Sequence, residues 1–132
     1  MERKSAALLD QCPTLVLSSI TEEGYPRGCV LVKVSNEGFQ KIRVSTGTSS
    51  RKTKHFLANP KASICFYNGA DGVTLLGKIR VLTDPKESDL YWQDWMIDHF
   101  PLGKNDPEFC VLEFTTEEAT IWIDNTFETY RY

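Results

Sequence analysis

The sequence predicts a mainly β protein with peripheral helices, arranged as a closed or nearly closed barrel. Six or seven segments have the composition of strands, and turn signals separate them at intervals of about 8–12 residues, as in small all-β barrels. Two central segments are apolar on both faces, which is typical of a wall with a core on one side and a helix or second subunit on the other. The 132 residues contain no linker or repeat, so we expect one domain over residues 1–132.

The first half of the chain predicts a short helix and a three-stranded antiparallel meander. Residues 3–11 contain good helix formers, and Pro13 stops the helix. Short turn clusters then separate three apolar segments, so consecutive strands are expected to pair. The expected strands are residues 14–20, 28–35 and 39–45.

A second helix is expected over residues 49–59, because Phe56 and Leu57 give it an apolar side and Asn59-Pro60 ends it. Strands over 62–68 and 73–83 follow. Gly77 interrupts the second of these strands, which indicates a bulge or bend.

A third, longer helix is expected to begin at Asp84 and stop at Pro101. Asp84 suits the N-cap, Pro85 suits the first helical position, and Glu87 completes a capping-box pattern. The helix would carry Leu90, Trp92, Trp95, Met96 and Phe100. We interpret its aromatic residues as core or dimer interface, the two places where aromatics dominate packing.

The chain is expected to end in a hairpin and a tail. Strands over 109–115 and 120–124 would flank Glu117-Glu118, interpreted as a solvated turn. The tail over 125–132 is polar and aromatic. Trp122 has two interpretations, a core residue or a residue that stacks on a ligand ring.

Composition excludes several classes of function. The net charge of −3 is unlike that of a general nucleic-acid binder, which has a basic face. No run of about 18 apolar residues predicts a membrane-spanning helix. The apolar stretch at residues 6–9 is too short for a signal peptide, so we expect a cytoplasmic protein.

The four cysteines lie far apart and form no C-x-x-C pair. Three of them lie in apolar runs, so we expect buried thiols that behave as small hydrophobic groups. The two histidines are too few and too scattered to build a zinc site, and no metal is expected.

The most informative segment runs from Ser45 to Lys52, where a strand ends and a helix begins. Five hydroxyl side chains and Gly47 crowd this turn, and Arg51 and Lys52 fall in the first helical turn. Cations there oppose the helix dipole and cost roughly 0.3–1 kcal/mol each. A bound phosphate would remove the conflict, because backbone N–H groups, hydroxyls and cations would all face one anion. From this motif alone, a solvated basic helix start capped by serine remains the alternative.

Lys33 is unusual because it lies in an otherwise apolar strand, on the same face as Cys29 and Leu31. A lysine whose ammonium reaches water beyond the strand end is one explanation. A ligand contact is the other.

Several segments occur in an order that resembles the pyridoxamine 5′-phosphate oxidase-like proteins. They are Val30-Leu31-Val32-Lys33, Ser45-Thr46, Ser50-Arg51-Lys52 and Asn59-Pro60-Lys61-Ala62. The likeness covers about residues 25–77, and the Ser-Arg-Lys followed by Asn-Pro is its most specific part. The resemblance implies an FMN-binding split β-barrel that forms a homodimer, with FMN at the interface.

The resemblance also implies roles for matching residues. The strand that ends in lysine would lie along the flavin and its ribityl chain, the next pair would contact the ribityl phosphate, and the Ser-Arg-Lys would hold the phosphate. The implied cofactor-binding residues are Val30, Leu31, Val32, Lys33, Ser45, Thr46, Ser50, Arg51 and Lys52.

The chain also departs from the oxidase pattern. Gly28 stands where the oxidase has an arginine, with Arg27 one residue early, and Gly72 replaces a flavin-contacting glutamine. The oxidase's C-terminal segment that binds pyridoxal phosphate has no counterpart. The chain is more similar to the general stress protein and nitroimidazole-resistance branch, which implies FMN but not vitamin B6 chemistry.

Three functions follow as hypotheses. The first is an FMN-dependent oxidoreductase on an unidentified small molecule, with no residue assigned to catalysis. The second is a non-catalytic flavin-binding stress protein. The third is a binding module for another phosphate ligand, such as a nucleotide or a haem-related anion.

Overall fold

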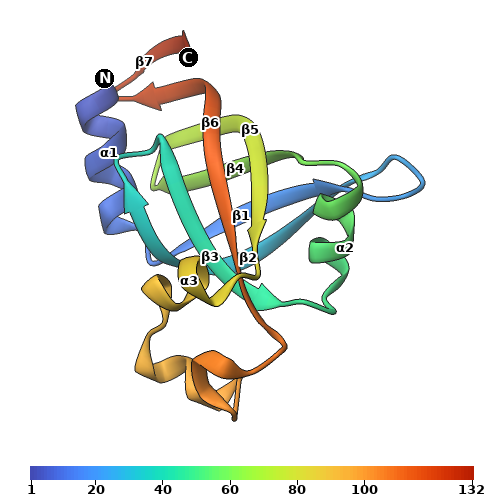
Figure 1. The fold of residues 1–132 in the computed structure, drawn as a ribbon. Coiled ribbons are helices and arrows are strands. Elements are labelled where there is room, and N and C mark those ends of the chain that lie inside the picture. The colour runs from blue at the N-terminus through green and yellow to red at the C-terminus, as the bar shows by residue number, and fades with distance from the viewer.

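Six antiparallel strands close a barrel in the computed structural model, which describes residues 1–132 (Figure 1). The strands are β1 (Thr14–Ile20), β2 (Pro26–Glu37), β3 (Lys41–Gly47), β4 (Lys61–Asn68), β5 (Asp71–Leu82), β6 (Phe109–Ile123) and β7 (Thr126–Arg131). The helices are α1 (Glu2–Gln11), α2 (Arg51–Ala58) and α3 (Pro85–Ser88). Three 3₁₀ turns are η1 (Asp89–Tyr91), η2 (Asp94–Asp98) and η3 (Gly103–Asn105).

The order of the strands is β3-β2-β1-β4-β5-β6-β7, and a further pairing of β3 with β6 closes the barrel. β7 pairs only with β6 and lies beside α1, so the two chain termini lie close together (Figure 1). The sequence-based prediction of a mainly β split barrel with peripheral helices is therefore confirmed.

The barrel is split because the end of β3 pairs with β6 but no longer with β2. Residues 41–44 of β3 pair with β2, and a register shift interrupts that ladder at Lys33/Ser35. All seven residues of β3 pair with β6, ending with Thr46 opposite Cys110 and Gly47 opposite Phe109. β2 and the end of β3 therefore diverge, and the gap between them opens beside the start of α2.

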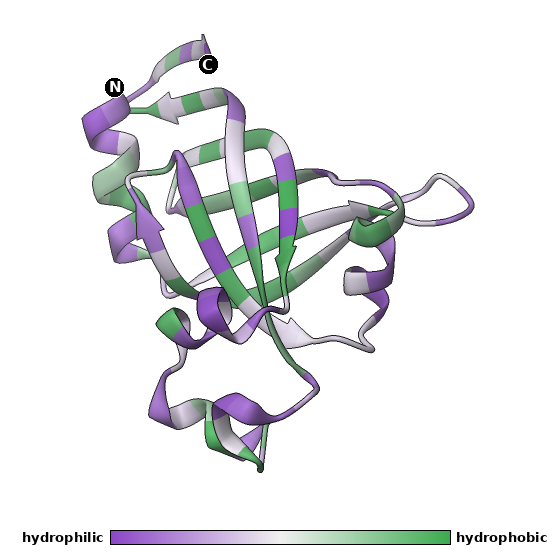
Figure 2. Ribbon diagram, viewed as in Figure 1, coloured by the Kyte–Doolittle hydropathy of each residue, from purple (hydrophilic) through white to green (hydrophobic).

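Two hydrophobic clusters hold the fold. Nineteen buried residues fill the barrel and the space under α1, among them Leu9, Phe39 and Phe114. Six more form a second cluster, in which Met96 and Phe100 cover Phe109 at the base of β6. Hydrophobic and hydrophilic residues alternate along β3 and β5, as expected for strands with one face on the core (Figure 2).

Most elements agree with the sequence-based predictions, including the strands of the first half, α1 and α2. The bulge at Gly77 is confirmed by a register shift between Leu76 and Gly77. A Cβ atom at Gly77 would lie 2.0 Å from the Thr115 carbonyl oxygen, so only glycine lets β5 and β6 approach this closely.

The prediction of one long helix over 84–100 is wrong. α3 ends at Ser88, and 3₁₀ turns continue the segment. Tryptophan and aspartate are weak helix formers, and packing Met96 and Phe100 on Phe109 outweighs helix continuity. Asp84 does cap α3 by accepting from the Lys86 N–H at 3.0 Å, but Glu87 pairs with Arg80 instead of completing a capping box.

The predicted hairpin around Glu117-Glu118 is also wrong. β6 continues through both residues. Glu117 is the extra residue of a bulge in β6, and the strands stay paired on either side of it, with Leu76 opposite Glu118 and Gly77 opposite Thr116. The hairpin turn is Asp124-Asn125, with φ of 53° and 60°, a two-residue turn that suits the strand twist. The polar and aromatic tail, for which the sequence predicted no element, forms β7.

Two further findings concern composition. Cys12 and Cys110 are buried as expected, whereas Cys29 and Cys65 are half-buried, and all four thiols are free. None of the helices combines the length and the apolar character needed to cross a membrane.

A buried ion pair fixes the register of β3 against β6. The Arg43 Nε atom donates to Glu113 at 3.0 Å, and both side chains are buried. Burial raises the pKa of the Glu113 carboxyl. The hydrogen bond from Arg43, the charge of Lys41 and the hydrogen bond from Arg80 together outweigh that effect and hold the pKa below its ordinary value of 4.5.

We predict that Glu113→Gln destabilises the protein by about 3 kcal/mol, because it removes the buried counterion of Arg43 and leaves only the exposed carboxylate of Glu37 beside the guanidinium. The pair's contribution is present above the ordinary glutamate pKa and is lost as pH falls through the lowered native pKa. Denaturant melts at pH 7 and pH 3 measure both effects, and the variant's deficit should shrink at pH 3. The control is Glu117→Gln in the exposed pair with Lys78, expected to change stability by less than about 0.5 kcal/mol.

Candidate functional site

A hollow of about 500 Å³ lies where β2 and β3 diverge, a volume in the range of small-molecule sites. It is lined by Val30, Leu31, Val32, Ser45, Thr46, Gly47, Trp95, His99, Phe100 and Glu108. Five of the nine residues expected to bind a cofactor are in that set, so the fold brings the two halves of the sequence motif together. The other four, Lys33, Ser50, Arg51 and Lys52, lie around its edge or face elsewhere.

One wall of the hollow is the apolar edge of β2. Val30 is 71% exposed and Val32 is 50% exposed, whereas Leu31 packs against the barrel core. A flat, partly apolar molecule could cover the two valines.

The Lys33 side chain points away from this wall. Its Nζ atom donates to the Leu9 carbonyl at 2.9 Å, near the C-terminal end of α1. Helix C-termini have carbonyls without intrahelical partners, and a cation stabilises them. This explanation for Lys33, a cap on α1, is neither of the two that the sequence suggested.

The opposite wall is the turn between β3 and α2. Ser50 is the N-cap of α2, and its Oγ atom accepts from the Thr53 N–H at 3.3 Å. Thr46 donates to the same Ser50 oxygen at 3.2 Å. Thr53 in turn donates to the Gly47 carbonyl at 2.7 Å, so hydroxyl groups tie the strand end to the helix start.

Two other hydroxyls of the turn bind a carboxylate of the chain itself. Glu108 accepts from the Ser49 hydroxyl at 2.7 Å, from the Ser49 N–H at 3.3 Å and from the Thr48 hydroxyl at 3.1 Å. The hydrogen bonds from the Ser49 hydroxyl and N–H hold the pKa of Glu108 below its ordinary value. The anion that the turn composition predicted is thus partly supplied by Glu108.

The cations of α2 have no partner in the chain. Arg51, Lys52 and Lys54 take part in none of the ion pairs or side-chain hydrogen bonds, and the first turn of α2 has no acidic residue. The conflict between these cations and the helix dipole that the sequence indicated is therefore present in the structure.

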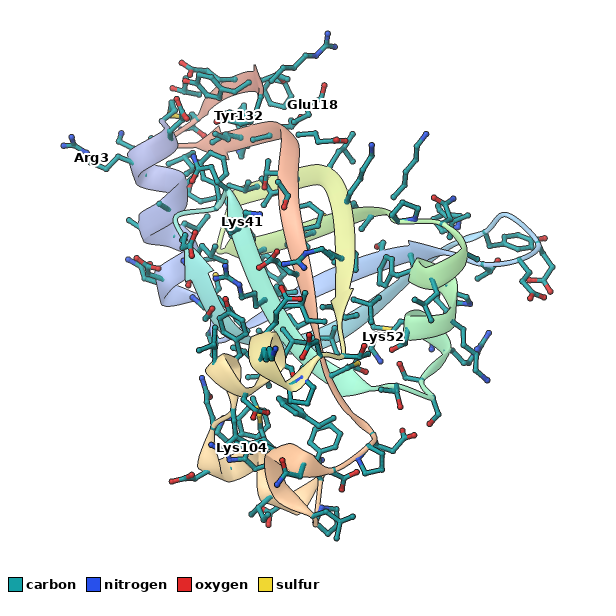
Figure 3. All side chains as sticks on the ribbon, in the orientation of Figure 1. Arg3, Lys41, Lys52, Lys104, Glu118 and Tyr132 are labelled. Atoms are coloured by element: carbon teal, nitrogen blue, oxygen red, sulfur yellow. The ribbon has the colours of Figure 1, made fainter.

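The three cations face in two directions. Arg51 and Lys54 line a second hollow of about 450 Å³ on the other flank of α2, together with Glu22, Glu23 and His55. Lys52 lies on the barrel side, close enough for its charge to lower the pKa of Cys110 (Figure 3). Burial dominates at that thiol and raises its pKa to about 11, which makes Cys110 a poor nucleophile.

The outer wall of the hollow is formed by residues of the β5–β6 connection that sequence reasoning did not assign to a site. Trp95 is 41% exposed, and its Nε1 atom donates to Gln93 at 2.6 Å. The ring of Trp95 meets that of His99 edge-on, with centroids 6.0 Å apart. No sequence motif marks Trp95, His99 or Glu108, because only the folded connection brings them to the gap.

The remaining tryptophans lie outside the hollow. Trp92 packs edge-on against Phe109, as expected for a core residue. Trp122 is on the outer face of β6 beside Phe127, at a centroid distance of 6.2 Å. No group of three or more His, Cys, Asp or Glu side chains is arranged as metal ligands would be.

Sequence and structure comparisons agree on one family. The family profile described as pyridoxamine 5′-phosphate oxidase matches residues 1–123. A comparison with characterised proteins found no match.

Solved structures of similar fold were also found. A Clostridium acetobutylicum protein related to general stress protein 26 of B. subtilis is 26% identical, with a TM-score of 0.88 over 98% of this chain and 93% of that one. General stress protein 26 of Bacillus anthracis is 19% identical, with a TM-score of 0.81 over 99% and 98%. A heme binding protein of Mycobacterium smegmatis shares the fold at 12% identity, with a TM-score of 0.77 over 98% of this chain and 57% of that one.

The profile match spans nearly the whole chain, and the split between β2 and β3 brings together two of the segments that carried the resemblance, residues 30–32 and 45–46. The chain belongs to the pyridoxamine 5′-phosphate oxidase family.

Proposed function

We propose that the protein binds FMN in the hollow between β2 and β3. The observation that carries this proposal is the combination of an apolar strand edge and a hydroxyl-rich turn around one space of about 500 Å³, with the unpaired cations of α2 directly after that turn in the chain. These are the groups that a flavin ring, a ribityl chain and a phosphate require.

The residues divide into two sets. Val30, Leu31 and Val32 would lie along the ring and ribityl chain, and Ser45 and Thr46 would contact the chain near its phosphate. The phosphate would be held by Ser50, Arg51 and Lys52 at the start of α2, where backbone N–H groups favour an anion. The Arg51 side chain would have to turn toward it from the second hollow, which it lines in the free protein. Lys33 would reach the flavin only after leaving the Leu9 carbonyl.

FMN would supply hydride transfer, and the chain would supply binding, orientation and charge. We propose an oxidoreductase acting on an unidentified small molecule, with a non-catalytic flavin-binding stress protein as the alternative. Turnover separates them: only an enzyme would oxidise a reduced nicotinamide or reduce a nitro compound faster than free FMN does. Four free thiols suit a reducing compartment, so we propose that the protein works in the cytoplasm.

A homodimer is part of the proposal, because an exposed apolar strip runs from the β2 wall across the outside of the barrel. Val30 pairs with Val16, and Trp122 pairs with Phe127. Tyr67, on β4 between them, is 72% exposed. A second copy related by two-fold symmetry would cover this strip and the open side of the hollow.

Haem is the second candidate ligand. His99 lines the hollow, and histidine is a common axial ligand of haem iron. The heme binding protein of M. smegmatis has the same fold. A Soret-band shift on adding hemin, abolished by His99→Ala, together with no FMN binding, would favour this candidate.

We predict that FMN binds the purified protein saturably and that riboflavin binds at least about 10²-fold more weakly. Riboflavin lacks the phosphate, and each hydrogen bond to a charged group contributes roughly 1.5–3 kcal/mol. Quenching of flavin fluorescence in parallel titrations measures both affinities. Equal affinities would place the phosphate outside the α2 cradle, and no saturation up to high micromolar FMN would rule out the cofactor.

Arg51→Glu tests the helix start directly. Arg51 has no partner in the chain, and an acid suits a helix N-terminus, so the stability of the apo-protein should stay unchanged or rise slightly. FMN affinity should fall by about 10²–10⁴-fold, through loss of a charge-assisted pair and gain of a repulsion.

The matched control is Lys54→Glu, the same charge change one turn later and in the same second hollow. It should weaken FMN binding far less than Arg51→Glu does. The phosphate assignment fails if Arg51→Glu destabilises the apo-protein by more than about 1 kcal/mol while FMN affinity barely moves.

We also predict that light scattering gives about twice the chain mass of 15.0 kDa. Tyr67→Lys should shift the protein toward monomer, because a charge would be buried in the proposed interface. Lys61→Glu, at an exposed position on the same strand, is the control and should leave the mass unchanged. A monomer that binds FMN with full affinity would contradict this arrangement.

A further inference from the structure

Glu108 reaches the hollow from outside the sequence motif. It lies in the loop before β6, and that loop is attached to the turn between β3 and α2 through its backbone. The Thr48 N–H donates to the Glu108 carbonyl at 2.8 Å, and the Thr48 hydroxyl donates to the Pro107 carbonyl at 3.2 Å. Asp106 accepts from the Glu108 N–H at 3.0 Å, which orders the loop locally. The loop therefore stays beside the turn whatever the Glu108 side chain does.

The Glu108 carboxylate lies against the turn formed by Gly47, Thr48 and Ser49. Both of its oxygens accept hydrogen bonds, from the Thr48 hydroxyl and from the Ser49 hydroxyl and N–H. A Cβ atom at Gly47 would lie only 2.9 Å from one of these oxygens, so the carboxylate packs directly on the glycine. It also lines the same hollow as Ser45 and Thr46.

The contact is not forced by core packing, because Glu108 is exposed to solvent. A ligand can therefore displace its side chain without opening the core. The carboxylate uses both donors of Ser49 and shares the single Thr48 hydroxyl proton with the Pro107 carbonyl, so it occupies donors that an incoming phosphate could otherwise use. Its charge also opposes any anion in the hollow.

We propose that Glu108 is a specificity-determining residue of the hollow, an internal anion that competes with the phosphate of a bound ligand. This inference rests on the proposed flavin site and adds a penalty against anionic ligands that the family resemblance does not contain. In the free protein, Glu108 accepts the hydrogen bonds of the donors in the turn. An anionic ligand then binds only if the free energy of its contacts to Ser50, Arg51 and Lys52 exceeds the free energy needed to displace or approach the carboxylate.

Glu108→Gln separates competition from a purely structural role. The amide keeps a hydrogen-bond acceptor for Ser49 and removes the charge. Competition predicts that FMN affinity rises at least about tenfold, while riboflavin affinity changes by less than about twofold. A structural role predicts that both flavins bind more weakly and that the thermal midpoint falls.

Asp10→Asn is the matched control, because it removes one negative charge on α1 and keeps an acceptor for Asn36. It should leave both flavin affinities unchanged, which excludes an effect of net charge alone. Equal or weaker FMN binding by Glu108→Gln overturns the inference even where wild-type FMN binding supports the proposed function.

A second readout does not depend on flavin. Inorganic phosphate should raise the thermal midpoint of Glu108→Gln more than that of the wild-type protein. If neither flavin binds either protein, the proposed cofactor is wrong, and this phosphate comparison alone decides the role of Glu108. Identical midpoint shifts in the two proteins then overturn it.

Discussion

The pairing of β3 with β6 is the interaction on which the site depends. β3 has seven residues, and all of them have partners in β6, whereas only its first part pairs with β2. Buried backbone N–H and C=O groups need partners, and β6 satisfies those of Ser45–Gly47 on one side. β2 can then diverge from β3, and the barrel opens a gap there while the backbone groups at the end of β3 keep their hydrogen-bond partners in β6. The Arg43–Glu113 ion pair fixes this register, since a shift of one strand by one residue would place the two charges on opposite faces of the sheet.

The electrostatics of the gap follow from where the chain places its charges. α2 begins with three cations and no acid, and the helix dipole adds partial positive charge at the same end. The carboxylate of Glu108 offsets part of this positive charge, because it accepts hydrogen bonds from Ser49, just before the helix. Glu108 is the carboxylate that is hydrogen-bonded to this turn, whereas Glu22 and Glu23 line the second hollow with Arg51 and Lys54 and form no ion pair with them. These contacts explain how the turn is satisfied without a ligand.

Local patterns explain which parts of this structure could be predicted from sequence. Period-two alternation and turn residues predict the strands, Pro60 ends α2 in the expected place, and Gly77 marks a bulge that its contact with Thr115 explains. The same local rules mispredict residues 84–100, where packing on Phe109 overrides the helix signal. They also mispredict the turn at Glu117-Glu118, because continuous pairing with β5 is a long-range effect.

The site shows the same division between local and long-range information. The motif from Ser45 to Lys52 is contiguous, so its composition could predict an anion cradle. Glu108 is 59 residues from Ser49 in sequence, and Trp95 belongs to the same distant connection. The positions of both residues depend on how that connection folds back over the gap. Lys33 shows the limit of a resemblance: its side chain is bound to the end of α1, a partner that no motif includes. Side-chain direction along a strand edge depends on what packs beyond it.

In the proposed arrangement, the open side of the hollow would link ligand binding to assembly. Val30 belongs both to the wall of the hollow and to the exposed apolar strip, so a second copy that covered the strip would also cover a ligand in the hollow. In the proposed dimer, a ligand on this wall would bury apolar area against the second copy that free water would otherwise contact. Ligand binding would then stabilise the dimer, and dimerisation would tighten ligand binding by the same free energy, because the two equilibria share one interface. A monomeric barrel could offer the phosphate end of the site, but it would leave the ring end on an exposed strand edge with solvent on its outer side.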